Sequence, residues 1–499
     1  MKRNLILTGD ARLELKKFDD NYADCCITSP PYFQLRDYDI KGQLGLETTI
    51  YEYIRNQMQV FKEVQRILKP TGVFFLNLGD TYAAYWGDNY GKAQSFNGDR
   101  ENKGNAPPSK PSPKFSKSKR IDRGSGRYDG GNAAPGENDN IKPKDLFGVP
   151  WSVALALRGS SVISHSVLSD WSAMLQQAID EKNLAYISTL KNTIDLWNFT
   201  EMFKTEGWYL RQDIIWQKDN PLPESVKDRC TKSHEYLFMF TKTNRYYFDT
   251  YAIMEEANFD GRKTTMMKPA TKYNGAFVPG QVENTFHASG HERWLRGPNG
   301  EYLRNKRSVW VINNKPYKDA HFAVFPEELP RICIKAASSE KGCCADCGKP
   351  WKRILVKDGQ VQNKKAISKK STETVKRYRG DKSTENSVFA EGMMNVYKSV
   401  GWEPTCECHG KFVKKKLTKT DPLYIEGEKN EYTVYEPKIP LDQHPIKPAV
   451  ILDPFMGSGT VAVVAKGLNR DYIGVELNPK YVKLKDKRIE QSFGMFADL

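Results

Sequence analysis

A short segment near the end of the chain has the residue types of a turn that binds a ligand. Residues 453–460 read Asp-Pro-Phe-Met-Gly-Ser-Gly-Thr, between a hydrophobic run that predicts a strand and a run that predicts a helix. Gly457 and Gly459 allow a ligand to approach the backbone closely, and the first turn of the helix offers free N–H groups. Glu476 ends the next expected strand, where a carboxylate suits the two hydroxyls of a ribose. The turn has no phosphate-binding lysine, so we expect a nucleoside ligand without a phosphate chain; a purely structural turn is the alternative.

A second segment of this kind lies near the start of the chain. Residues 28–32 read Thr-Ser-Pro-Pro-Tyr and follow an expected strand at 23–28. Ligands of open α/β sheets bind outside the carboxyl ends of the strands. The prolines fix the loop, so Ser29 and the Pro30 carbonyl can accept hydrogen bonds from an exocyclic amino group, while Tyr32 offers a face on which a base can stack. Alone, this segment could be a rigid turn; its pairing with the glycine turn favours a site.

Together the two segments resemble the DNA amino-methyltransferases that use S-adenosyl-L-methionine, the N4-cytosine/N6-adenine family. The catalytic segment comes first and the cofactor loop near the C-terminus, an order similar to that of the beta, circularly permuted class. Gly9-Asp10-Ala11 and residues 42–47, 77–80, 214–218 and 321–326 also look like segments of that family. The resemblance implies an α/β fold with a Rossmann-like, doubly wound, mostly parallel sheet, in which N- and C-terminal parts of the chain form one sheet.

The resemblance also implies roles for individual residues. The catalytic residues would be Ser29, Pro30, Pro31 and Tyr32, with the first two aiming the amino group and the tyrosine holding the base. The residues that bind the cofactor would be Asp10, Thr28, Asp453, Pro454, Phe455, Gly457, Ser458, Gly459, Thr460, Glu476 and Phe325. The target base must leave the duplex to be reached, and positioning does most of the work because the methyl donor is already activated.

The residue at position 29 bears on the choice of base. Serine there resembles the N4-cytosine enzymes, so we expect methyl transfer to the exocyclic N4 of a flipped cytosine in double-stranded DNA. An N6-adenine methyltransferase and a catalytically silent DNA-binding protein of the same fold are the alternatives. An RNA methyltransferase is disfavoured by the long recognition region.

The charge of the chain supports a polyanionic partner. Its 76 Lys and Arg exceed its 61 Asp and Glu, which gives a formal charge of +15. Basic and aromatic residues are concentrated in the non-periodic middle of the chain, where they suit phosphate contact and base reading. The expected DNA-binding residues are Lys218, Arg293, Arg304, Lys306, Arg307 and Trp310. A solvated basic surface would explain any one of them.

The cysteines indicate a metal site. Five of the nine fall between Cys343 and Cys408. Cys344 and Cys347 form a CxxC segment followed by glycine, and Cys406 and Cys408 form a second pair, so four thiolates could make a closed structural Zn²⁺ site. Cys343 or His409 could replace a neighbour, and unmetallated free thiols are the alternative. Clustered cysteines without a disulfide pattern predict a reducing, cytoplasmic location.

Composition and motifs divide the chain into seven regions. These are 1–86, the N-terminal half of the sheet with the catalytic motif; 87–140, a basic low-complexity loop; 141–248, a core continuation with a helical insertion at about 159–198; 249–318, a target-recognition region; 319–340, a cofactor-side helix; 341–445, a zinc-binding insertion; and 446–499, the C-terminal cofactor-binding half. We expect no membrane association and a cognate restriction endonuclease as a partner. Whether the chain is a monomer or a homodimer is left open.

Overall fold

The computed structural model describes residues 3–38, 40–83, 144–159, 176–177, 179–181, 207–221, 223–224, 227–256, 294–296, 302–314, 325–362, 393–416 and 431–493. The expected loop at 87–140, nearly all of the insertion at 159–198 and Arg293 lie outside these residues. The chain divides into two compact units. The first contains Met1–Phe248, Arg307–Gly342 and Pro448–Leu499, and the second contains Asp249–Lys306 and Cys343–Lys447.

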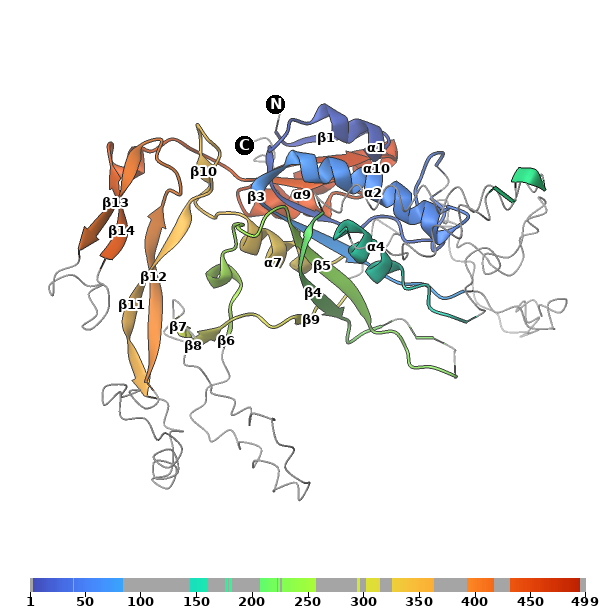
Figure 1. The fold of residues 1–499 in the computed structure, drawn as a ribbon, viewed down its shortest axis with the longest axis horizontal. Coiled ribbons are helices and arrows are strands. Elements are labelled where there is room, and N and C mark those ends of the chain that lie inside the picture. The colour runs from blue at the N-terminus through green and yellow to red at the C-terminus, as the bar shows by residue number, and fades with distance from the viewer. Residues whose placement is uncertain are drawn as a thin grey trace, which may run out of the picture. The chain divides into compact units, whose positions relative to one another are not determined.

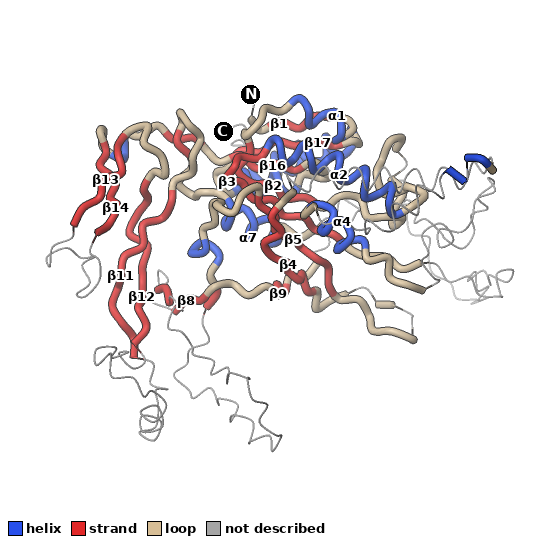
Figure 2. Tube along the Cα trace, in the orientation of Figure 1, coloured by secondary structure: helices blue, strands red, loops and turns tan. Residues whose placement is uncertain are grey.

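The first unit is built on an eight-stranded sheet with the order β1-β17-β16-β2-β3-β5-β4-β9 (Figures 1 and 2). In that order the strands are Leu5–Thr8, Asp471–Glu476, Val450–Asp453, Ala23–Thr28, Leu68–Leu78, His234–Thr241, Tyr209–Gln217 and Val309–Val311. The strands from β1 to β3 are parallel, β5 is antiparallel to both neighbours, and β9 is parallel to β4. Because β16 pairs with β2, the two ends of the chain form the centre of one sheet, which confirms the predicted fold class.

Two groups of helices accompany this sheet. The helices α1 (Ala11–Glu14), α2 (Ile50–Ile67) and α4 (Val149–Leu157) form the first group, in which α2 packs on both others. The second group contains α7 (Glu328–Ala337), α9 (Thr460–Gly467) and α10 (Pro479–Phe493), in which α9 packs on both others. This grouping is that of a doubly wound sheet.

Local sequence explains where α2 begins and ends. The hydroxyl of Thr49 accepts a hydrogen bond from the Glu52 N–H at 3.2 Å, which caps the helix. Apolar residues at steps of three and four, including Met58, Phe61 and Val64, are fully buried. The helix ends at Ile67, and β3 begins directly after it at Leu68, which pairs with Ala23 of β2.

The second unit contains an antiparallel-rich sheet and two small strand pairs. The five-stranded sheet has the order β11-β12-β7-β8-β6, with strands Lys352–Gln362, Met393–Glu403, Trp294–Arg296, Tyr302–Arg304 and Glu255–Glu256. The pairs are β13–β14 (Gly410–Lys416 and Glu431–Pro437) and β10–β15 (Cys343–Cys344 and Ile446–Lys447). Short 3-10 turns occur at Leu15–Lys17 in the first unit and at Thr250–Ile253 and Leu441–Gln443 in the second.

This division differs from the expected regions. The recognition region and the cysteine-containing region were expected as separate segments, but β12 pairs with β7, so both contribute to one sheet. The expected recognition region ends at 318, but residues from Arg307 onward belong to the first unit, where β9 pairs with β4. Within the part of the chain that the structure describes, no helix is long and apolar enough to cross a bilayer.

Candidate active site

The two predicted motif segments meet at the centre of the sheet. Strands β2 and β16 are parallel neighbours, with Cys26 opposite Leu452, so both motifs follow carboxyl ends on the same edge. The hydroxyl of Thr28 donates a hydrogen bond of 2.6 Å to the Asp453 carboxylate, and both side chains are buried. This bond joins residues that are 425 positions apart in the chain.

The conformation of the glycine turn is fixed in part by a carboxylate from the next strand, β17. Gly457 and Gly459 have φ angles of +53° and +82°, which a residue with a side chain adopts only under strain. Glu476 accepts hydrogen bonds of 2.7 Å from the backbone N–H groups of Gly457 and Asn478. A carboxylate offers about four lone-pair sites, so Glu476 keeps acceptor capacity for a ligand.

Burial favours the neutral forms of the two carboxyl groups at this edge of the sheet. It raises the pKa of Asp453 to about 7, with a smaller contribution from the nearby Glu476 carboxylate, although the hydrogen bond from Thr28 opposes the shift. Burial also raises the pKa of Glu476, opposed by the N–H groups that the carboxylate accepts. A cationic or hydroxyl-bearing ligand would favour the ionised forms of both groups.

Asp10 lies at the same edge, after β1. Its carboxylate accepts from the Arg12 N–H at 2.9 Å and pairs with the Arg12 guanidinium at 2.6 Å. Burial acts against ionisation, but these contacts outweigh it and hold the pKa of Asp10 below its usual range. The Gly9 N–H donates to the Glu476 carbonyl at 3.0 Å, so the ends of β1 and β17 lie together.

The remaining predicted cofactor residues have mixed surroundings. Pro454 is buried and Phe455 half-buried in the turn, and Phe325 is half-buried just before α7. Ser458 and Thr460 are buried and contact the Arg488 guanidinium, at 3.4 and 2.8 Å. Arg488 also pairs with Glu327 at 2.8 Å, so these two hydroxyls tie the turn to α10 and the start of α7.

The catalytic loop is anchored through Tyr32. Its hydroxyl donates to the Glu235 carboxylate at 2.6 Å, lies 3.1 Å from the Asn77 amide oxygen, and accepts from the Ser29 hydroxyl at 3.3 Å. Its ring lies against the backbone of Gly79, where an added Cβ would come within 2.5 Å of a ring carbon. Burial, followed by the Glu235 carboxylate, raises the pKa of Tyr32 well above its usual value, so the hydroxyl keeps its proton.

Glu235 and Asn77 were not among the predicted site residues. The Asn77 amide donates to Glu235 at 3.2 Å and to the Tyr236 carbonyl at 3.1 Å. Lys218 pairs with Glu235 and its ammonium lies 4.3 Å from the centre of a Trp216 ring. Asn77 could have been found from the sequence, because it is a polar residue near the end of the hydrophobic run 73–78. Nothing in the sequence around Glu235 indicates a site residue.

Neighbouring segments fix the rest of the loop. Tyr53 of α2 donates to the Pro31 carbonyl at 2.9 Å, and the Gly45 carbonyl accepts from the Gln34 N–H at 2.6 Å. The Gly45 N–H in turn donates to Glu47 at 2.7 Å. Asp80 accepts from the first N–H groups of α4, so its role is to cap that helix.

The expected DNA-binding residues do not form one group. Arg304 of the second unit pairs with Glu255 at 2.9 Å, and Lys306 belongs to the same unit, whereas Arg307 belongs to the first. Lys218 faces Glu235, with only 16% of its side chain exposed. Trp310 is buried at 5% exposure and donates to the Arg307 carbonyl at 2.8 Å, so its ring is not presented to a base in this structure, and its expected base contact stays a prediction. Its aromatic side chain packs in the sheet instead.

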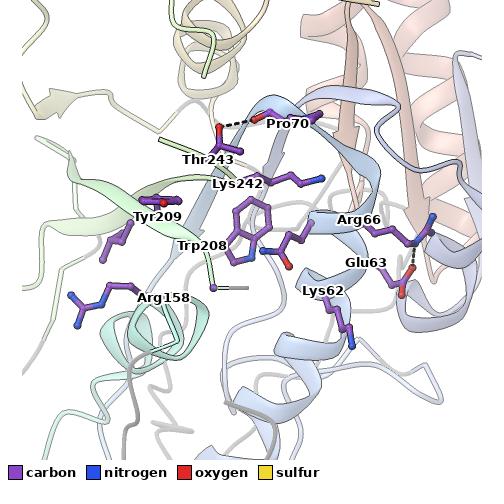
Figure 3. A pocket seen from close by; sticks show the side chains of 12 residues that line it. Lys62, Glu63, Arg66, Pro70, Arg158, Trp208, Tyr209, Lys242 and Thr243 are labelled. Atoms are coloured by element: carbon purple, nitrogen blue, oxygen red, sulfur yellow. Dashed lines mark hydrogen bonds and ion pairs between the residues drawn. The ribbon is translucent and has the colours of Figure 1, made fainter. Parts of the chain in front are cut away.

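A large cavity lies elsewhere on the first unit (Figure 3). Its volume is about 910 Å³, and it is lined by residues that include Lys62, Arg66, Trp208 and Lys242. It adjoins Pro70 near the start of β3, whereas the catalytic loop follows the end of the parallel strand β2. None of the predicted catalytic or cofactor residues lines it.

Comparison with known proteins identifies the class. A model of the N6/N4 DNA methylase family matches residues 23–117, 163–347 and 441–487, which is more than half of the chain. The chain therefore belongs to this family of DNA methylases. Its membership makes it an amino-methyltransferase that acts on DNA.

Individual relatives are Type II methyltransferases. M.SmaI of Serratia marcescens is 31% identical over 344 residues, which cover 68% of this chain and 77% of that protein. M.XycI of Xanthomonas campestris pv. cyanopsidis is 26% identical over 490 residues, covering 98% of this chain and 89% of that protein. Among solved structures, the PvuII DNA methyltransferase (cytosine-N4-specific) is 13% identical with a TM-score of 0.40, covering 100% of this chain and 87% of that one.

Proposed function

We propose that the chain transfers the methyl group of S-adenosyl-L-methionine to the exocyclic N4 of a cytosine flipped out of double-stranded DNA. The observation that carries this proposal is the hydrogen bond between Thr28 and Asp453. It sets the Ser-Pro-Pro-Tyr loop and the glycine turn beside each other at the carboxyl edge of a parallel sheet, where such folds bind their ligands.

The acidic edge of the sheet has hydrogen-bond acceptors of the kind that this cofactor needs. Glu476 retains lone pairs for ribose hydroxyls, and the buried Asp453 and Glu476 would gain from a nearby cation because burial disfavours their ionised forms. Asp10, Thr28, Pro454, Phe455 and Phe325 would line the same site, while Ser458 and Thr460 support the turn. Bound S-adenosyl-L-methionine supplies an already activated methyl group.

The catalytic loop would then position the base. Ser29 and the Pro30 carbonyl would accept from the amino group, and Pro31 is held by Tyr53. Tyr32 would stack on the base while its hydroxyl remains tied to Glu235. Holding the amino nitrogen in line with the methyl group would account for most of the acceleration.

The choice of cytosine rests on the residue at position 29. A serine hydroxyl can accept from the N4 amino group and, once its proton turns from Tyr32 to the base, donate to the neighbouring N3, which a carboxylate cannot do. Adenine presents a similar pair at N6 and N1, so transfer to adenine N6 is the outcome that would overturn this part of the proposal. The relatives are Type II methyltransferases, so a restriction endonuclease for the same sequence is the expected partner, in the cytoplasm.

Base-resolved sequencing of DNA from cells that express the chain would test the proposal. We expect N4-methylcytosine at one short sequence motif and none with the Ser29→Ala variant. N6-methyladenine at a motif would reassign the base. Labelled cofactor that transfers nothing to duplex DNA, or that labels only RNA, would support a silent DNA-binding protein or an RNA methyltransferase and refute the proposal.

A further inference from the structure

Four cysteines of the second unit converge on one point. Cys344 lies on β10 and Cys347 in the turn that follows, whereas Cys406 and Cys408 lie between β12 and β13. Their Sγ atoms all lie within 4.8 Å of one another, and none forms a disulfide. Residues 59 or more positions apart are thus brought together by folding.

The size of the cluster matches a tetrahedral metal site. With metal–sulfur bonds of about 2.3 Å, a tetrahedron has sulfur–sulfur edges of about 3.8 Å. The observed separations accommodate such edges, whereas a disulfide needs sulfurs about 2.05 Å apart. Four thiolates would fill the coordination sphere and leave no position for water or substrate, which is the arrangement of a structural zinc site.

The backbone around the first pair is shaped to present both sulfurs. The Gly348 N–H donates to the Cys344 carbonyl, and the Cys344 N–H donates to the Lys349 carbonyl, both at 2.9 Å. Gly348 has a φ of +73°, which allows the chain to turn directly after Cys347. The two arms are also joined, because the Thr405 hydroxyl donates to the Pro350 carbonyl at 2.6 Å.

The alternative ligands fit less well. Cys343, beside Cys344, is not part of the converging group. His409 forms a second possible group with Cys344 and Asp346, but its Nε2 lies 2.8 Å from the Asp346 carboxylate and its ring lies 5.1 Å from that of His444. We propose that Cys344, Cys347, Cys406 and Cys408 bind one Zn²⁺ ion as a closed structural site.

The position of the cluster indicates what the metal would hold. Lys352 and Glu403 form the first pair of the β11–β12 ladder. Lys352 comes shortly after Cys347, and Glu403 comes shortly before Cys406. Gly410, at the start of the β13–β14 pair, comes two residues after Cys408. Zinc would therefore fix the point from which both strand pairs begin. Strand β12 also pairs with β7, which lies in one sheet with β8 and β6 of the recognition region. The metal would therefore also stabilise that sheet.

Metal analysis of the purified full-length chain tests the site without an activity measurement. We expect about one zinc per chain, and tetrathiolate absorption bands when Co²⁺ replaces it. Cys347→Ser and Cys408→Ser, at the two exposed ligands, should lose both signals, whereas Cys230→Ser, an exposed cysteine of the first unit, should keep them. A chain that binds neither metal, or that loses both equally with Cys230→Ser, would overturn the proposal.

A second measurement tests the metal site separately from the proposed function. The expected effect of the metal on DNA binding rests on that proposed function. Zinc removal by a chelator should weaken DNA binding at least tenfold while S-adenosyl-L-methionine affinity stays within twofold, because the cofactor edge belongs to the first unit. Equal DNA affinity with and without zinc would refute the stabilising role. Zinc that binds as expected to a chain without methyl transfer would leave the metal site standing and refute the proposed function alone.

Discussion

The hydroxyl of Tyr32 lies 2.6 Å from the carboxylate of Glu235, although the two residues are 203 positions apart in the chain. Glu235 is the second residue of β5 and pairs with Trp216 of β4, and β5 is antiparallel to β3, which carries Asn77. The expected base-stacking tyrosine is thereby held by residues of two strands, β5 and β3, as well as by Ser29 of its own loop. Lys218 supplies the opposite charge that Glu235 requires in a partly buried position.

We expect Glu235→Gln to lower the methyl-transfer rate about 10- to 100-fold with little change in cofactor affinity. The substitution keeps the shape but removes a charged hydrogen-bond acceptor, worth about 1.5–3 kcal/mol. It also leaves Lys218 without its carboxylate partner. Single-turnover rates with labelled cofactor, together with calorimetry of cofactor binding, would measure both effects.

The matched control is Tyr32→Phe, which removes the other side of the same bond. If the two side chains act through this contact, the double variant should lose much less than the sum of the single losses. Fully additive losses would show that Glu235 acts independently of Tyr32.

The sequence was sufficient for the parts of the site that follow local patterns. A buried strand followed by a stiff or glycine-rich turn identifies its own carboxyl end, so Thr28, Ser29, Asp453 and Glu476 could be placed at one edge. These features depend on neighbouring residues and need no knowledge of distant pairing.

The features that were missed depend on strand register. Glu235 reaches Tyr32 only because β5 runs antiparallel to β3, and a one-residue shift would turn it to the other face. Trp310 was interpreted as a base reader because it lies among basic residues, yet β9 adds to the edge of the sheet at Ile215–Gln217 and buries it. The basic composition of a segment does not predict which strand of a sheet it will pair with.

The Glu476→Ala variant should bind S-adenosyl-L-methionine about 10- to 100-fold more weakly. It removes the expected ribose acceptor, at about 1.5–3 kcal/mol, and releases the N–H groups of Gly457 and Asn478 that shape the turn. Glu490→Ala, at an exposed position on α10, should bind normally. Calorimetry that gives equal affinities for the two variants would remove Glu476 from the cofactor site.

Asp453→Asn should stabilise the cofactor-free chain relative to the wild type as the pH rises. Because the pKa of Asp453 is about 7 in the folded state and 3.8 ordinarily, the folded wild type holds a proton that the unfolded chain releases between these values. Wild-type stability therefore falls from about pH 4 to about pH 7 and levels off above it, by on the order of a few kcal/mol. Asparagine keeps the acceptor for Thr28 and has no such proton. Denaturant unfolding of both proteins at about pH 5 and about pH 8 would reveal a pH-independent difference if the prediction is wrong.

Trp310→Ala should destabilise the fold without changing the sequence preference of DNA binding. The side chain is buried and its N–H bonds the Arg307 carbonyl, so truncation should cost about 3–5 kcal/mol of unfolding free energy. Denaturant unfolding measures the loss, and affinities for the methylated sequence and a scrambled duplex measure the preference. A changed ratio of the two affinities in a chain of normal stability would instead support Trp310 as a base reader.

Arg307→Ala should relax the sequence preference of DNA binding at one position. Its side chain is exposed, and its backbone carbonyl, which Trp310 needs, is unchanged by the substitution. A lost base contact costs about 1–3 kcal/mol on the preferred duplex and little on a scrambled one. A lost phosphate contact would instead weaken both duplexes alike and flatten the dependence of log affinity on log salt by about one unit. We therefore propose affinity titrations over a range of salt on both duplexes, together with Lys306→Ala, which tests a second expected DNA contact in the same way. Equal losses on both duplexes for Arg307→Ala would assign that residue to the phosphate backbone and leave the base-reading residues unidentified.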